Sequence, residues 1–225
     1  MLRLSLSGWD VAFTQRDDGD LRVSARDPAA EPLEEVQSRV LRSLELDGVA
    51  VPRQVHGAKV AIIEQPLRGY TVAIAEADGV ATVVAGLAAG VHVADCLPIA
   101  IGGEGGVAMV HGGWRGLAGG VVVAGVRALR RLGVDGSLQA VIGPGAGGCC
   151  YETGAEVRER FCAYGAARGR LLDLKAVAAA QLRDAGVEVV HDVGVCTICD
   201  PAASVFSHRR EGAGTGRQGG FAWRR

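Results

Sequence analysis

The stretch VHVADCLPIAIGGEGGVAMVHGGWRG, residues 91–116, decides how this chain folds. Two short apolar runs flank a Gly-rich centre at 102–106, a pattern that predicts an antiparallel hairpin with a tight turn. A turn centred on Gly103 and Glu104 places Cys96 opposite His111, to within about one residue of register. Cross-strand partners lie roughly 5 Å apart at Cβ. We therefore expect these two side chains to be able to share one metal ion.

The composition is typical of a protein with one apolar core. The chain has 225 residues, of which 48% are hydrophobic, and we predict a single domain over residues 1–225. Lys and Arg number 24 against 25 Asp and Glu, a formal net charge of -1. This balance gives no indication of nucleic-acid or membrane partners. The N-terminus has no signal-peptide pattern and no run approaches the roughly 20 apolar residues of a membrane span, which predicts a cytoplasmic location.

Periodicity predicts alternating strands and helices along the chain. We expect strands at 2–7, 77–84, 86–95, 138–142 and 187–191, two strand segments in 49–64 that meet at His56 and Gly57, and a further strand after a turn at 17–20. We expect helices at 32–46, 116–132 and 173–185, and one from about 153. The N–H groups at the start of the 116–132 helix are expected to favour an anion beside Arg115.

The cysteines do not form a disulfide pattern. Six cysteines in a chain of this length, two of them adjacent, favour reduced thiols. Cys196 and Cys199 form a CxxC pair, a spacing found in redox and zinc sites. Because the sequence shows no second CxxC and no nearby His pair, we interpret this pair as structural.

Six sequence blocks together resemble a known family. They are QVHGAKV (54–60), ADGVAT (77–82), ADCLPI (94–99), VHGGWRG (110–116), IGPGAGGCCYETG (142–154) and FSHRREGAGTGR (206–217). In this order they resemble the YfiH/laccase-domain family, also described as polyphenol oxidases or FAMIN-like purine nucleoside phosphorylases. The resemblance implies an α+β fold, a four-layer α/β/β/α sandwich with mixed sheets. It also implies zinc-dependent phosphorolysis of purine nucleosides, with adenosine deamination and methylthioadenosine cleavage as related activities.

The resemblance also implies which residues bind the metal. His56, Cys96 and His111 are expected to be the ligands, although a lone His beside Gly, as at His56, is more typical of a structural residue. The chain departs from the family pattern near its start, where Arg16 alone is easily matched, and at His208, where Tyr is common. Gly145 and Gly148 also replace a Cys and a Pro of the family's Gly-Pro-rich block.

Two His and one Cys leave one position of a tetrahedral zinc open, which is typical of a catalytic site. Such a metal lowers the pKa of bound water or polarises an oxygen of the reactant. Asp95, which precedes Cys96, is a candidate to orient a ligand or take a proton, although an Asp at a strand end is as often a backbone cap.

Phosphorolysis requires a phosphate dianion near an electron-poor sugar carbon, and Arg binds phosphate through paired N–H donors. The candidates are Arg16, Arg115, Arg209 and Arg210, all in or near the motif blocks. The expected small molecules are therefore a purine nucleoside and phosphate. The expected oligomeric state is a monomer or a homodimer.

Two other functions fit the same residues. A His₂Cys set also binds copper, so a copper-dependent polyphenol oxidoreductase is an alternative, with Met109 as an axial ligand. A multicopper laccase needs many more histidines than the five present. A Cys/His hydrolase, such as a peptidoglycan-precursor editing enzyme, would use Cys96 as nucleophile and His111 as base. Zinc is the expected cofactor and copper the alternative.

Overall fold

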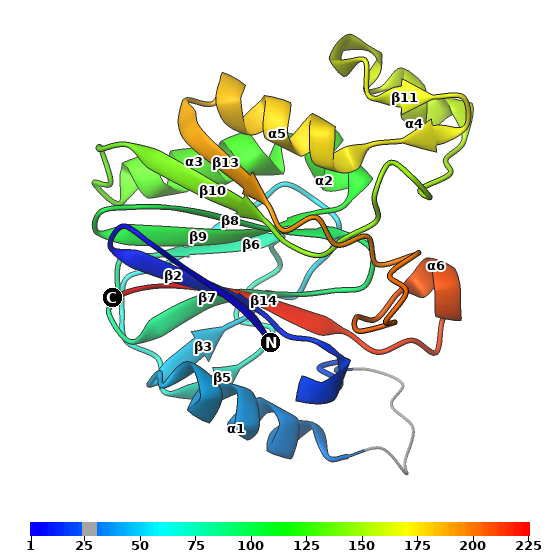
Figure 1. Cartoon of the computed structure of the whole chain (residues 1–225). Helices are drawn as coiled ribbons and strands as arrows, with labels where there is room; N and C mark the ends of the chain where they lie inside the picture. The colour runs from blue at the N-terminus through cyan, green and yellow to red at the C-terminus, as the bar shows by residue number, and fades with distance from the viewer. Residues whose placement is uncertain (24–30) are drawn as a thin grey trace.

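Two mixed six-stranded sheets form the centre of the molecule. The computed structural model describes residues 1–23 and 31–225 (Figure 1). The first sheet consists, in spatial order, of β1 (Leu2–Leu6), β2 (Trp9–Phe13), β14 (Gln218–Arg224), β7 (Leu87–Val93), β3 (Gly48–Ala50) and β5 (Gly69–Thr71). The second consists of β13 (Val187–Asp192), β10 (Leu138–Ile142), β8 (Leu97–Gly103), β9 (Gly106–Gly112), β6 (Gly79–Thr82) and β4 (Ala61–Ile63). A short ribbon of β11 (Ala167–Arg168) and β12 (Leu171–Leu172) lies apart from both.

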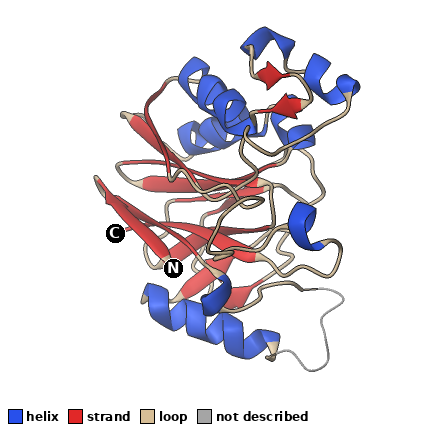
Figure 2. Cartoon of the chain, turned by 45° about the vertical axis from the view of Figure 1, so that its right-hand side comes forward, coloured by secondary structure: helices blue, strands red, loops and turns tan. Residues whose placement is uncertain are grey.

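Helices cover the outer faces of both sheets, which gives four layers (Figure 2). The amphipathic helix α1 (Leu33–Leu44) packs its apolar face on the first sheet. Helices α2 (Trp114–Ala118), α3 (Val121–Arg131) and α5 (Leu174–Asp184) cover the second sheet. The remaining short helices are α4 (Ala155–Glu159), α6 (His208–Glu211), η1 (Arg16–Asp18) and η2 (Cys162–Tyr164). The predicted α+β, four-layer α/β/β/α fold with mixed sheets is confirmed.

The central hairpin forms as predicted, but its register differs. The two residues of the turn are Glu104 and Gly105, because Gly103 pairs with Gly106 and Gly105 adopts a positive φ of 97°. Leu97 therefore pairs with Gly112, and Cys96 lies opposite Gly113 instead of His111. The predicted direct pairing of Cys96 with His111 is wrong. Because the partner moves by two residues, both side chains stay on one face of the sheet as diagonal neighbours.

Several predicted elements agree closely with the structure, and three do not. The strand segments of 49–64 do not meet at His56, because β3 and β4 belong to different sheets and a loop joins them. The predicted helix 116–132 is divided into α2 and α3, because Gly120 adopts a positive φ between them. The strand expected after residues 17–20 falls partly on 24–30, outside the described residues, and 21–23 belong to no strand.

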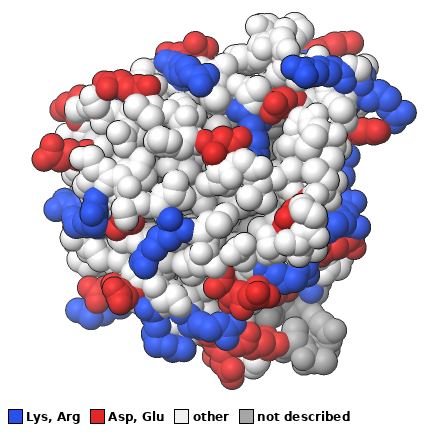
Figure 3. All heavy atoms as spheres, viewed as in Figure 1, with Lys and Arg blue, Asp and Glu red and all other residues white. Residues whose placement is uncertain are grey.

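Charges of both signs are interspersed over the face in Figure 3, in keeping with the formal net charge of -1. Among the helices of the described ranges, none is both long enough and apolar enough to cross a membrane.

Small residues allow the two sheets to approach each other closely. The apolar layer between them contains Trp9 and Val91 from the first sheet and Met109 and Val141 from the second. Gly102 in β8 lies directly beneath the Trp9 indole, because a Cβ at Gly102 would come within 2.6 Å of two ring atoms. The indole and the strand thus occupy space that a larger residue would need.

Replacing Gly102 with Ala should destabilise the protein by about 1–3 kcal/mol, since the added methyl group forces the Trp9 ring or β8 to shift. Urea unfolding measures this free energy. The matched control is Gly136→Ala, because the Cβ added there meets no atom within 4 Å and the φ at Gly136 is not in the left-handed region. Equal unfolding free energies for the two variants would contradict this account of the interlayer packing.

Candidate metal centre

His56, Cys96 and His111 converge from three separate segments. Their ligand atoms all lie within 4.8 Å of one another. His111 lies in β9, Cys96 directly precedes β8, and His56 lies in the loop between β3 and β4. The two imidazole rings meet edge to face with centroids 4.8 Å apart. The structure thus brings together the three residues that the sequence blocks single out.

The loop that carries His56 is fixed by the carboxylate of Asp78. The backbone N–H groups of Val55, His56 and Gly57 donate to this carboxylate at 3.3, 2.8 and 2.6 Å. His56 itself adopts a left-handed φ of 59°, which is uncommon for a residue other than glycine. Three converging N–H donors compensate for this conformation, so the position of His56 depends on Asp78.

Asp78 also orients His111. Its Oδ1 lies 2.9 Å from Nδ1 of His111, and the Asp78 side chain is fully buried. The pairing arises because β6 and β9 are antiparallel neighbours with Gly79 opposite Val110, which places Asp78 opposite His111. Although burial raises the pKa of Asp78, the hydrogen bonds from His111 and Gly57 outweigh it and lower the pKa below its usual value.

Asp78 is the functional residue that the sequence analysis missed. It lies in the block ADGVAT at 77–82, which carries the family resemblance, but the sequence gives no role to this residue of the block. The geometry gives it one: with Nδ1 of His111 bonded to Asp78, Nε2 is the ring nitrogen that remains for a metal.

The electrostatics of the centre favour the thiolate form of Cys96. Burial raises the pKa of Cys96, but the charge of His111 and hydrogen bonds from His111 and His56 lower it to below the usual value. For His111, burial lowers the pKa, whereas the Cys96 thiolate and the Asp78 carboxylate raise it, with a net increase. A thiolate is both the metal-binding form and the nucleophilic form of cysteine.

The residues present fit a divalent metal of the zinc type. The donor set is two imidazoles and one thiolate, the ligand types that zinc binds, and it is one ligand short of a tetrahedron. A Cβ at Gly113 would come within 3.1 Å of the Cys96 sulfur and 3.4 Å of Cδ2 of His56. A side chain at position 113 would therefore press on two of the three expected ligands, and glycine leaves them room.

Asp95 faces the C-terminal loop. Its Oδ1 accepts from Thr197 Oγ1 at 2.5 Å and from Ser207 Oγ at 2.7 Å, and its Oδ2 accepts from the Arg209 backbone N–H at 2.7 Å. Asp95 has a positive φ of 84° and lies directly before Cys96. Through these hydrogen bonds the buried Asp95 carboxylate connects the hairpin to the C-terminal loop. The carboxylate that contacts His111 is that of Asp78.

Two of the four predicted phosphate-binding arginines form ion pairs within the protein. Arg16 and Arg210 both donate to Oε1 of Glu211, at 2.5 and 2.6 Å. Arg210 also donates to the carbonyls of Thr197 and Val205, at 2.7 and 2.6 Å. Their guanidinium groups therefore secure the C-terminal loop in this structure.

The other two arginines are exposed and lie over aromatic rings, and Arg209 also donates through Nη1 to the Glu152 carbonyl at 2.9 Å. Arg115 lies over Trp114 and Arg209 over Tyr151, with the guanidinium carbon 4.3 and 4.9 Å from the ring centroids. A fifth guanidinium, that of Arg217, is half-buried and donates through Nη1 to carbonyls of its own loop. Burial and Arg22 lower the pKa of Arg217, while Asp20, Cys96 and Asp95 act in the opposite direction.

Cys196 and Cys199, which the sequence analysis interprets as a structural pair, have two further cysteines as neighbours. Cys149 and Cys150 lie beside them, and the four sulfur atoms form the second group in the described part of the chain that could bind a metal. The sequence does not show this because about 46 residues separate the two pairs and chain folding alone brings them together. His92 belongs to neither of these two groups, and its Nε2 atom lies 2.7 Å from the Tyr70 hydroxyl.

The fold and the centre define a class, a four-layered α/β/β/α protein with a His₂Cys group beside its central hairpin. The model of a family described as multi-copper polyphenol oxidoreductase laccase matches residues 14–225, and the chain belongs to this family. This agrees with the resemblance to the YfiH/laccase-domain family found in the sequence blocks.

Relatives that are named for an enzyme activity align with most of the chain. A purine nucleoside phosphorylase of Xylella fastidiosa (strain 9a5c) is 37% identical over 209 residues, which are 85% of this chain and 78% of that protein. An adenosine deaminase from an unknown prokaryotic organism is 35% identical over 196 residues, covering 77% of this chain and 74% of that protein. The crystal structure of Neisseria meningitidis protein NMB0706 has a TM-score of 0.82 at 27% identity, with 98% and 96% of the two chains covered.

Replacing Asp78 with Asn should weaken metal binding about 10- to 100-fold. The amide places an NH₂ group where the carboxylate accepts N–H donors, so both His111 and the loop of His56 lose their orientation. Competition with a chromophoric chelator measures the zinc affinity. Asp184→Asn, on an exposed carboxylate at the end of α5, is the control. An unchanged affinity in a folded Asp78→Asn protein would show that Asp78 does not position the ligands.

Proposed function

We propose that this protein is a zinc-dependent purine nucleoside phosphorylase acting on adenosine, inosine and methylthioadenosine. The observation that carries the proposal is the convergence of His56, Cys96 and His111 beside a loop rich in arginine. Relatives named purine nucleoside phosphorylase support the same reaction class. Adenosine deamination is proposed as a second activity of this centre, because one relative is named an adenosine deaminase.

In this proposal His56, Cys96 and His111 hold the zinc ion, and Asp78 keeps His111 in one tautomer and one orientation. When bound, the metal supplies a positive charge that polarises an oxygen of the reactant. The open side of the three ligands is where a reactant would bind. Because residue 113 is a glycine, it places no side chain against Cys96 and His56.

Phosphate would be bound by guanidinium groups. Arg209 is the first choice, because Asp95 fixes its backbone beside Cys96, and its exposed side chain lies over Tyr151 and donates to the Glu152 carbonyl. Arg115 is the second, since it lies just beyond His111 at the start of α2. Arg16 and Arg210 are given structural roles, because both pair with Glu211.

The reaction has a simple balance. A phosphate oxygen forms a bond to the anomeric sugar carbon while the bond from that carbon to the purine nitrogen breaks. The bonding electron pair leaves with the purine, which takes up a proton, and the products are the free base and ribose 1-phosphate. The arginines orient the phosphate dianion. Their positive charge also reduces its repulsion from the Cys96 thiolate.

A second candidate function follows from the contacts of Cys96. Its sulfur lies within 4.8 Å of a ring nitrogen of His111, and His111 is bonded to Asp78, which is the order of nucleophile, base and orienting carboxylate in thiol hydrolases. Without a metal, this trio would be a candidate for cysteine-based hydrolysis. A copper-dependent oxidoreductase corresponds to the description of the family model. Metal analysis and rapid alkylation of Cys96 separate these functions from the first.

Replacing Cys96 with Ala should remove one bound zinc and reduce nucleoside cleavage by more than about 100-fold, because a thiolate ligand is lost. The fold should persist, since Cys96 lies at the edge of an apolar core. Zinc content by mass spectrometry of metals and release of hypoxanthine from inosine are measured together. Full activity in the variant, or wild-type protein with no zinc at Cys96 and rapid alkylation of that thiol, would contradict the proposal.

Cleavage of inosine or adenosine should require added phosphate and release ribose 1-phosphate, because the attacking group is the phosphate oxygen. Arg209→Lys keeps the charge but loses the two-pronged donor geometry, so the KM for phosphate should rise roughly tenfold with zinc content unchanged. Arg131→Lys, on an exposed residue at the end of α3, is the matched control. A rate independent of phosphate would favour the hydrolase.

A further inference from the structure

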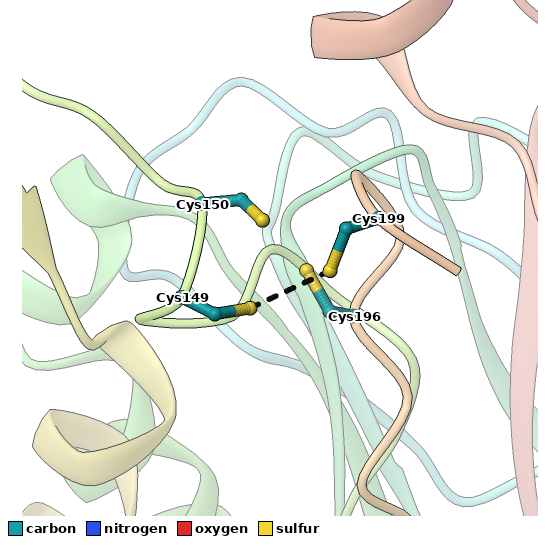
Figure 4. A group of neighbouring side chains, drawn as sticks. All are labelled: Cys149, Cys150, Cys196 and Cys199. Carbon is teal, nitrogen blue, oxygen red and sulfur yellow. Dashed lines mark hydrogen bonds between the residues drawn. The ribbon is translucent and has the colours of Figure 1, made fainter. Parts of the chain in front are cut away.

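A second cluster of sulfur atoms lies outside the centre described above. Figure 4 shows the side chains of Cys149, Cys150, Cys196 and Cys199, which come from two loops and point toward one another. Their sulfur atoms all lie within 4.8 Å of one another. The sulfurs of Cys149 and Cys199 are 3.6 Å apart. Four thiols thus gather around one small volume, and none of them is a residue of the candidate metal centre.

These separations suit one tetrahedral metal ion. Zn–S bonds of about 2.3 Å in a tetrahedron place the sulfur atoms about 3.8 Å apart. The separation between the sulfurs of Cys149 and Cys199 is already close to that value. All the other sulfur pairs lie within 4.8 Å, so the four sulfurs can be the ligands of a tetrathiolate site, the arrangement typical of structural zinc.

The backbone around the cluster is arranged to accept a negative sulfur. The Gly147 N–H donates to the Cys196 sulfur at 3.2 Å. A hydrogen bond from a backbone N–H group stabilises a thiolate.

The fold explains why the two loops meet. Strands β10 and β13 are parallel neighbours, so the loops that follow them leave the same edge of the sheet. The contact continues beyond the strands, because Gly145 forms a parallel bridge with Cys196. Lys175 of α5 adds to it by donating to Asp192 and to the Val195 carbonyl. The cysteine pairs are therefore placed together by the sheet itself.

We propose that Cys149, Cys150, Cys196 and Cys199 form a second metal site, a structural tetrathiolate site for a divalent ion of the zinc type. The site joins the loop after β10 to the loop after β13. Thr197 lies between two of its ligands and donates to Asp95, the residue before Cys96. The bound ion thereby stabilises the loop that borders the candidate metal centre. This inference does not depend on which reaction that centre catalyses.

The test is the zinc content of the full-length protein purified under reducing conditions. We expect about two equivalents per chain in the wild type, about one in Cys96→Ala, about one in Cys199→Ser, and none in the double variant. Cys162→Ser is the matched control, because Cys162 is exposed and belongs to neither group. It should keep two equivalents. Loss of only the Cys199-dependent zinc would leave the first centre intact, which separates this inference from the proposed function.

A second measurement identifies the ligands. Cobalt(II) added to metal-free Cys96→Ala protein should give the thiolate-to-metal charge-transfer and strong visible bands of a tetrahedral thiolate site, and Cys149→Ser should weaken them. This readout uses no variant of Cys199 and so remains valid if Cys199→Ser does not fold. Failure of Cys96→Ala protein to bind either ion, or thiol titration showing a disulfide among these four residues, would overturn the proposal.

Discussion

The buried carboxylate of Asp78 is the interaction on which the arrangement of the candidate metal centre depends. It accepts N–H donors from three consecutive backbone positions, 55–57, and from the His111 ring. A fully buried charge is stable only when its lone pairs are satisfied, and here four donors satisfy them. One side chain therefore fixes the loop of one histidine and the tautomer of the other. The third expected ligand, Cys96, is held independently by its attachment to the hairpin.

The two sheets make this arrangement rigid. His111 and Asp78 lie on antiparallel neighbours, β9 and β6, whose register is set by Gly79 opposite Val110. A slip of one residue between these two strands would place the two side chains on opposite faces of the sheet. The close packing beneath Trp9, where Gly102 has no room for a side chain, opposes such a slip in the adjoining strand. Ligand geometry at the rim is thus a consequence of packing in the interlayer core.

The hairpin could be predicted from sequence because its signals are local, whereas the four layers were implied by the resemblance to the family. Apolar alternation and a Gly-rich turn are visible within about twenty residues, whereas the register could not be fixed, since five residues at 102–106 offer several turn positions. Asp78 and the four-cysteine cluster were missed for another reason. Each depends on which strands are neighbours, β6 with β9 and β10 with β13, and this is a property of the whole sheet order. Resemblance to the family supplied His56, which no local pattern distinguishes from a structural histidine.

The C-terminal loop connects the two groups of cysteines through Asp95. This residue precedes Cys96 in the chain. Its carboxylate accepts hydrogen bonds from the Thr197 and Ser207 hydroxyls and from the Arg209 backbone N–H. Thr197 lies between Cys196 and Cys199, so the path from one group to the other consists of one hydrogen bond and a few covalent bonds. A loop with many glycines would sample many conformations unless tied at several points. In the proposed arrangement an ion on the four cysteines restricts that loop, and the position of Arg209 relative to Cys96 is restricted with it.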